Sequence, residues 1–111
     1  MPGHPAPTPT DNNAANAAGQ AALARLLAIA ATETGQSRRV ADFLLAWWNA
    51  EAYGGFDPTA LWSLEPALRD DILTVLHLIA HDREHATAYD HGDAFAALVQ
   101  RWRPHVTTGV R

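Results

Sequence analysis

Apolar residues recur along this chain at intervals of three and four positions, which is the spacing of an α-helix that buries one face. Four segments show this pattern, and none shows the strict alternation expected of a strand. A short segment between the second and third of them has the composition of a single helical turn. The pattern predicts an all-α fold, a small single-domain bundle of about four helices plus a short helical turn.

Each predicted helix gathers its large apolar side chains on one face. These faces should meet in one core, because a helix in a small domain is stabilised mainly by burial of its apolar face. The predicted core residues are Leu23, Leu26, Leu27, Ala30, Val40, Phe43, Leu44, Trp47, Leu61, Trp62, Leu68, Ile72, Val75, Leu76, Ile79, Phe95, Leu98, Val99 and Trp102.

Residues that cap or end helices mark the first boundaries. Gly35 is predicted to close the first helix and Ser37 to cap the second. The two glycines at 54–55 are predicted to end the second helix. Asp57 followed by Pro58 is predicted to start the short turn.

The two later helices carry similar signals. Pro66 is predicted to open the longest helix, over residues 66–84, because proline suits the first turn of a helix. Asp93 or Asp90 is predicted to cap the last helix. Pro104 is predicted to stop it.

The composition changes at both ends of the chain. Residues 1–12 are rich in Pro and Thr and have no apolar side chain larger than Ala after Met1. Such a segment cannot bury enough surface to offset the entropy cost of ordering, so it is predicted to be a disordered tail. Residues 13–104 form the predicted helical domain, and residues 105–111 a flexible C-terminal end.

The second helix is apolar over an unusually wide arc, roughly 200° of its circumference. Val40, Leu44 and Trp47 lie on one face, whereas Leu45 and Trp48 lie well round from it. A helix with so wide an apolar arc is either central in the fold or covered by a partner.

The flank of this helix is predicted to bind a partner. The predicted partner-binding residues are Leu45, Trp48 and Ala52. Tryptophan, tyrosine and arginine are enriched at the hot spots of protein interfaces, and the chain has four Trp and two Tyr. Trp47, Trp62 and Trp102 are expected in the core, whereas Trp48 is expected to stay partly exposed.

Composition excludes several classes of chemistry. The 111 residues include no cysteine, which excludes disulfides, zinc–thiolate sites and a cysteine nucleophile. Twelve acidic and eight basic residues, the latter all arginine, give a net charge of −4, whereas a nucleic-acid binder needs a clustered basic face. No apolar run approaches the roughly 20 residues that span a bilayer, and no secretory signal is seen. We therefore expect no nucleic-acid or membrane partner and a cytoplasmic location.

The segment HLIAHDREH, residues 77–85, carries three histidines at intervals of four. Two histidines at i and i+4 on a helix can chelate a divalent metal through neutral imidazoles. On a helical wheel, however, His77 and His81 lie opposite the core-facing residues of the long helix. A solvated helix face is therefore the preferred interpretation, and His77, His81 and His85 are the alternative metal ligands.

Known metalloenzyme motifs fit this segment poorly. A zincin helix needs Glu directly after its first His to activate water, but Leu78 stands there. The His81–Asp82 pair is similar to the centre of the HD phosphohydrolases, which also need a His from an earlier helix. No His lies between His4 and His77, so that ligand is missing.

Four stretches together resemble a known family: FLLAWWNAEAYGGFD, then LW, DILTVLHLIAH and HGDAFAALVQRWRP. The family is a domain-of-unknown-function family of small proteobacterial proteins that is often met on plasmids and integrative mobile elements. The resemblance covers about residues 38–104. It implies a mobile-element context and brings no activity, cofactor or catalytic residue.

These observations lead to two hypotheses from different classes. The first is a non-enzymatic protein-interaction module, an accessory or anti-defence modulator from a mobile element. It would bind another protein or a second copy of itself, and it would have no catalytic residue and no cofactor. The second is a metal-dependent hydrolase that uses His77, His81, Asp82 and His85. Stoichiometric zinc, manganese or iron in protein purified without a His-tag would favour the second.

Replacing His77 and His81 with Gln should change the free energy of unfolding by no more than about 0.5 kcal/mol, as surface substitutions usually do. Chemical denaturation followed by circular dichroism measures this difference. Loss of folding would show that the two histidines belong to a site and not to a solvated face.

Overall fold

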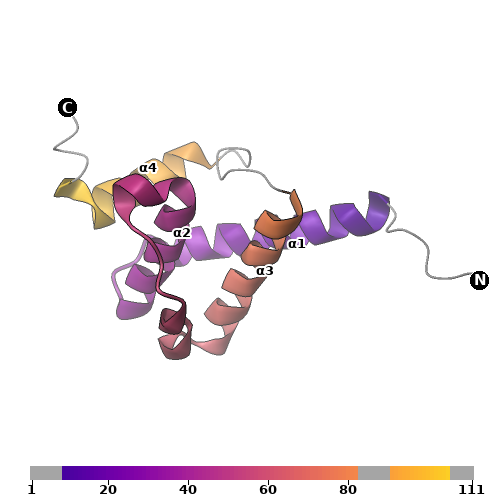
Figure 1. Ribbon diagram of the computed structural model, residues 1–111, viewed down its shortest axis with the longest axis horizontal. Coiled ribbons are helices and arrows are strands. Elements are labelled where there is room, and N and C mark those ends of the chain that lie inside the picture. The colour runs from indigo at the N-terminus through magenta and orange to yellow at the C-terminus, as the bar shows by residue number, and fades with distance from the viewer. Residues whose placement is uncertain (1–8, 83–90, 106–111) are drawn as a thin grey trace, which may run out of the picture.

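The computed structural model describes residues 9–82 and 91–105, and every regular element in these ranges is a helix. The elements, in chain order, are α1 (Pro9–Ala30), α2 (Gly35–Tyr53), the 3₁₀ helix η1 (Pro58–Ser63), α3 (Pro66–Asp82) and α4 (Gly92–Trp102) (Figure 1). The predicted all-α fold of four helices and one short turn is therefore confirmed.

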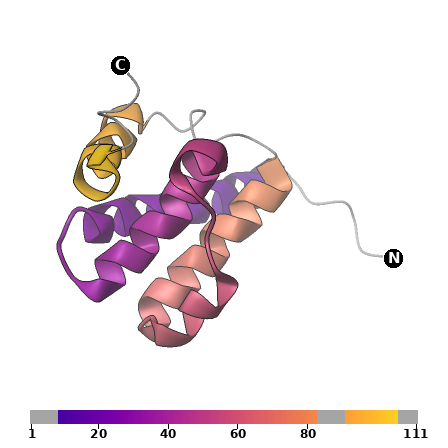
Figure 2. The same ribbon diagram turned by 60° about the vertical axis from the view of Figure 1, so that its left-hand side comes forward.

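The fold is built on α1, the longest helix at 22 residues. Both α2 and α3 pack against α1, and α4 packs against α2 (Figure 2). The N-terminal part of α1 extends beyond α3, away from the rest of the bundle (Figure 1). No helix in the described part of the chain combines the length and apolar character needed to cross a bilayer.

One core lies where the helices meet, and the predicted faces of the first and last helices are confirmed in it. Their large apolar side chains are buried at the positions that the spacing predicts, except Trp102, which is half-buried against the core. The buried apolar residues are Ala22, Leu23, Leu26, Leu27, Ala30, Val40, Ala41, Phe43, Leu44, Leu45, Leu64, Ile72, Val75, Leu78, Phe95, Leu98 and Val99.

Helix α3 is rotated about its own axis relative to the prediction. Ile72 and Val75 are buried as predicted, but Leu76 is 42% exposed and Leu78 only 3%. The reason is a close approach of α1, because a Cβ atom on Gly19 would lie 2.8 Å from the Cβ of Leu78. Since Gly19 has no side chain, the two helices can meet at this point, and Leu78 fills the contact.

The boundary between α1 and α2 also differs from the prediction. Thr34, not Ser37, is the N-cap of α2. The Thr34 hydroxyl oxygen accepts from the Ser37 N–H at 3.0 Å, and the Ser37 hydroxyl oxygen accepts from the Thr34 N–H at 3.3 Å. This reciprocal pair is a capping box, which sets the start of α2. Helix α1 already ends at Ala30, so Gly35 is the first residue of α2 and does not close α1.

Helix α2 ends at the two glycines, as predicted, and Gly54 has a φ of 94°, a value that favours glycine. A kink at Asn49, where φ is −168° and ψ is 91°, has no counterpart in the prediction. The Asn49 side chain compensates for the break, because its Oδ1 accepts a hydrogen bond from the Ala52 N–H at 3.2 Å. One further helical turn therefore follows the kink.

Helix α4 begins after His91, and no side chain caps it by a hydrogen bond. Asp93 lies in the first turn, where its charge favours the helix dipole, so it is not the predicted cap. Asp90, the other predicted cap, lies outside the described residues. The helix ends at Trp102, two residues before Pro104, as predicted.

Arg103, directly after α4, ties this helix to α2. Its Nη2 donates to Asp42 at 2.6 Å, and its Nε donates to the Tyr53 carbonyl oxygen at 3.0 Å. The Arg103 side chain is only 17% exposed. Hydrogen bonds from a charged donor are worth roughly 1.5–3 kcal/mol each, so this arginine helps to hold α4 in place.

The first helix begins earlier than predicted. Helix α1 starts at Pro9, inside the segment 1–12 that the sequence predicts to be a tail. Proline is favoured in the first turn of a helix, and the Ala-rich sequence that follows has high helix propensity. Residues 1–8 and 106–111 lie outside the described residues, so a disordered tail and a flexible C-terminal end stay predictions.

Gly19→Ala should destabilise the protein by roughly 1 kcal/mol or more, although alanine is the better helix former. The new methyl group would meet a Cβ that is fixed to the backbone of α3, so the two helices would have to separate. Urea denaturation measures the loss. Gly55→Ala is the matched control, because no atom lies within 4 Å of the position of its added Cβ. A Gly19→Ala protein as stable as the wild type would show that α1 and α3 do not meet there.

Candidate functional site

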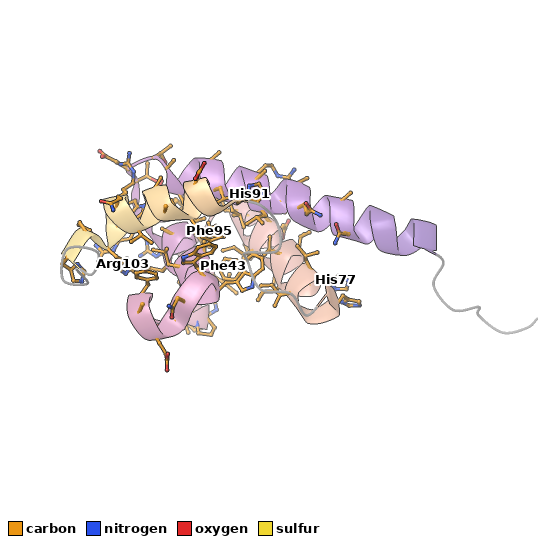
Figure 3. All side chains as sticks on the ribbon, turned by 90° about the horizontal axis from the view of Figure 1, so that it is seen from above. Phe43, His77, His91, Phe95 and Arg103 are labelled. Carbon is orange, nitrogen blue, oxygen red and sulfur yellow. The ribbon has the colours of Figure 1, made fainter. Side chains whose placement is uncertain are left out.

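Helix α4 covers part of the α2 flank that the sequence predicts to bind a partner. Phe95 of α4 is fully buried and stacks on Trp48, with ring centroids 4.5 Å apart and an angle of 10° between the planes. It also meets Trp47 edge to face, with centroids 6.4 Å apart. Figure 3 shows Phe95 pointing from α4 toward α2. The wide apolar arc of α2 therefore reflects its central position in the fold.

The predicted partner-binding residues do not come together on the surface. Leu45 is completely buried, Trp48 is half-buried and Ala52 is exposed. Trp47 and Trp102 are half-buried as well, so partial exposure does not distinguish Trp48. Leu45 belongs to the buried core in this structure, and partner binding by Leu45, Trp48 and Ala52 stays a prediction.

Trp62 is the tryptophan that the fold leaves in solvent. Its side chain is 85% exposed, whereas the sequence predicts it in the core. A 3₁₀ helix has three residues per turn, so Leu61 and Leu64 lie on one face of η1 and Trp62 on another. Leu64 is buried and Leu61 half-buried, and this face is the one that meets the core.

Two further large apolar side chains are exposed, both on α3. Leu73 is 48% exposed and Leu76 42%, and they share a face because they are three residues apart. We use the name outer surface for these three exposed apolar side chains together, Trp62 of η1 and Leu73 and Leu76 of α3. The sequence contains a signal for it, since Leu73, Leu76 and Ala80 recur at spacings of three and four on the side of α3 away from the core.

Asp57 fixes the turn that carries Trp62. Its Oδ1 accepts hydrogen bonds from the Thr59 N–H at 2.9 Å and from the Thr59 hydroxyl at 2.8 Å. These bonds, the backbone one first, lower the pKa of Asp57. A carboxyl group whose pKa is lowered by folding stabilises the fold at neutral pH, and this contribution is lost as the pH falls through the lowered value. Acid should therefore loosen η1.

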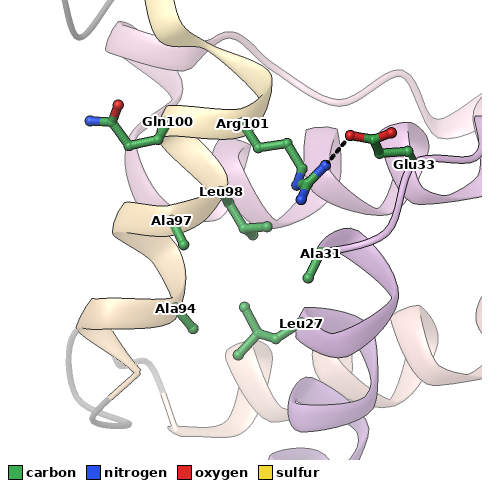
Figure 4. Close-up of a pocket in the computed structure, with 8 residues that line it drawn as sticks. All are labelled: Leu27, Ala31, Glu33, Ala94, Ala97, Leu98, Gln100 and Arg101. Atoms are coloured by element: carbon green, nitrogen blue, oxygen red, sulfur yellow. Dashed lines mark hydrogen bonds and ion pairs between the residues drawn. The ribbon is translucent and has the colours of Figure 1, made fainter.

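An open groove of about 650 Å³ lies between the C-terminal part of α1 and α4 (Figure 4). Its walls carry apolar side chains such as Leu27, Ala31 and Ala97. Arg101 donates to Glu33 across it, with 2.7 Å between Nη1 and Oε2, so the two charges compensate each other. The lining contains no Ser, Thr, His or Lys side chain. Sequence reasoning missed this groove because its two walls come from distant parts of the chain.

His77 and His81 come together on the exposed side of α3. Their ring centroids are 4.0 Å apart with an angle of 32° between the planes, and the His81 Nδ1 lies 3.0 Å from the His77 carbonyl oxygen. The described residues contain no group of three or more His, Asp or Glu side chains suited to a metal. Asp82 is the last residue of α3, and His85 lies outside the described residues, so the structure tests only part of the predicted cluster.

The chain belongs to a family of unknown function (DUF7673), which matches residues 20–103. The matched segment runs from α1 to the residue after α4, and it includes the outer surface, the groove and both histidines. No curated protein and no solved structure matches the chain. The resemblance to an uncharacterised domain family is confirmed by this match.

Trp48→Ala should destabilise the protein by about 2 kcal/mol or more, because it removes the ring on which Phe95 stacks. Trp62→Ala should change the free energy of unfolding by no more than about 0.5 kcal/mol, because the indole is in solvent. Urea denaturation followed by circular dichroism compares the two variants. A Trp48→Ala protein of wild-type stability would contradict the enclosure of α2 by α4.

Proposed function

We propose that this member of the DUF7673 family is a non-enzymatic module that acts by binding another protein through the outer surface. The observation that carries the proposal is the 85% exposure of Trp62. Tryptophan is among the residue types most enriched at the hot spots of protein interfaces. In solvent it contributes little to the stability of the fold, whereas at an interface it can contribute a large share of the binding energy.

The outer surface has physical properties that suit binding. A buried aromatic anchor can contribute about 2 kcal/mol or more, which corresponds to roughly a 30-fold change in Kd. Leu73 and Leu76 project from α3, which is fixed to the core through Ile72 and Val75. Side chains on a fixed helix lose less conformational entropy on binding than side chains on a loop, so more of the interaction energy appears as affinity.

The metal-dependent hydrolase is the weaker alternative. The hydrolase hypothesis uses His77, His81, Asp82 and His85. Among these, the structure shows a contact between the side chains of His77 and His81. A catalytic zinc needs three protein ligands and an open position. The groove between α1 and α4 is lined by apolar side chains and a compensated ion pair, which suits binding better than acid–base chemistry.

We further propose that the module works in the cytoplasm as an accessory or anti-defence modulator encoded on a mobile element. The support is the resemblance of residues 38–104 to small proteobacterial proteins met on plasmids and integrative elements. A net charge of −4 favours a protein partner over a nucleic acid, whose phosphates need a basic surface.

Affinity capture from the native host, followed by measurement of Kd with the recovered protein, tests the proposal. The wild-type chain and Glu51→Ala should bind the same partner, because Glu51 is exposed on α2 and lies outside the outer surface. Trp62→Ala should weaken the complex by roughly 30-fold or more while the chain stays folded. Equal affinity of Trp62→Ala and wild type would place the binding surface elsewhere.

A further inference from the structure

His77 and His81 already have the spacing of a chelating pair. They lie one helical turn apart on the exposed side of α3, and their ring centroids are 4.0 Å apart. Two nitrogen ligands of a tetrahedral zinc ion, each about 2.0–2.1 Å from the metal, are roughly 3.3 Å from each other. A centroid separation of 4.0 Å is compatible with that nitrogen spacing. Figure 3 shows His77 directed away from α2 and α4, where a metal has access to it.

The hydrogen bond of His81 sets its tautomer for metal binding. Its Nδ1 lies 3.0 Å from the His77 carbonyl oxygen, and a carbonyl oxygen can only accept. The proton of a neutral His81 ring is therefore on Nδ1, and the lone pair is on Nε2. A histidine that ligates a metal through one nitrogen almost always donates its other N–H to a carbonyl, a carboxylate or water.

The chemistry of this pair selects the class of metal. Neutral imidazole suits zinc, copper and nickel, whereas magnesium and calcium prefer oxygen ligands. A structural zinc site takes four ligands in a tetrahedron. His77 and His81 supply two of these ligands, and no third side chain of residues 9–82 and 91–105 joins them, so this pair provides half of a tetrahedral site.

We propose that the other half comes from the same two histidines of a second copy, so that one zinc ion joins two chains through α3. This inference goes beyond the proposed function, because it makes a second copy of the chain, and not another protein, the partner at Leu73 and Leu76. A two-fold axis brings identical residues of two chains together, which gives four imidazoles from two. Leu73 and Leu76 are exposed on the same helix, and such a pairing would shield them from water.

The position of α3 allows this pairing without refolding. Leu78 is packed against Gly19, and Arg25 Nη2 donates to Asp71 at 2.8 Å, so α3 is fixed to α1 along a face next to the one that carries the histidines. The two imidazoles therefore stand on a helix that keeps its shape when the metal binds. Such preorganisation lowers the entropy cost of forming the site.

Zinc titration of the full chain, purified without a His-tag, tests the inference by sedimentation velocity and metal analysis. With EDTA the chain should be a monomer, and with zinc it should form a dimer that holds one zinc per two chains. Cobalt in place of zinc should give the intense visible absorption of a tetrahedral site. Magnesium should have no effect. His77→Gln and His81→Gln should each weaken zinc-dependent dimerisation by roughly tenfold or more, whereas His105→Gln, at an exposed position after α4, should not.

The outcomes separate this inference from the proposed function. Three results would overturn the inference. They are zinc bound at one ion per chain without a dimer, no zinc binding, and a zinc-dependent dimer of the His77→Gln/His81→Gln variant that is unchanged from wild type. If a host protein still binds the wild-type chain and not Trp62→Ala, the proposed function stands on its own. If zinc forms the dimer and Trp62→Ala loses no partner, the four-histidine site stands and the role of Trp62 fails.

Discussion

Phe95 fills the space between α4 and α2, and its ring touches two indoles of α2 at once, one face to face and the other edge to face. Aromatic pairs of both geometries add to the free energy gained by burial alone. This contact places α2 between α1 and α4 and covers its aromatic side. It also determines which apolar side chains remain for a partner. With Trp47 and Trp48 packed against Phe95, the exposed tryptophan is Trp62.

The sequence predicted best those features that depend on the residues of a single helix. The apolar faces of α1 and α4 follow from helical spacing alone, because the same three or four positions must turn inward wherever the helix packs. The end of α2 followed from its glycines for a similar local reason. The orientation of α3 could not be predicted in this way. It depends on Gly19, a residue on another helix, whose missing side chain lets Leu78 approach and turns Leu76 outward.

The candidate sites also differ in whether they depend on one helix or on the packing of several. The proximity of His77 and His81 could be predicted from the sequence, because residues four apart on a helix are always close. The choice between Trp48 and Trp62 as the exposed tryptophan was not, because it depends on where α4 lies. The groove that Arg101 and Glu33 border has walls from two helices that are distant in the chain, so no local pattern predicts it. A capping box at Thr34 was missed for a simpler reason, since Ser37 is an equally good cap by residue type.

The contacts that enclose α2 come from a segment that follows α1, α2 and α3 in the chain. Arg103 bonds to Asp42, which precedes it by 61 residues, and to the carbonyl of Tyr53, which precedes it by 50. A chain that emerges from its N-terminal end can assemble α1, α2 and α3 before α4 exists. Until then the indole rings at 47 and 48 face water or any protein nearby. Enclosure of both indoles therefore waits for α4, whose bonds to α2 through Arg103 span 61 and 50 residues of the chain.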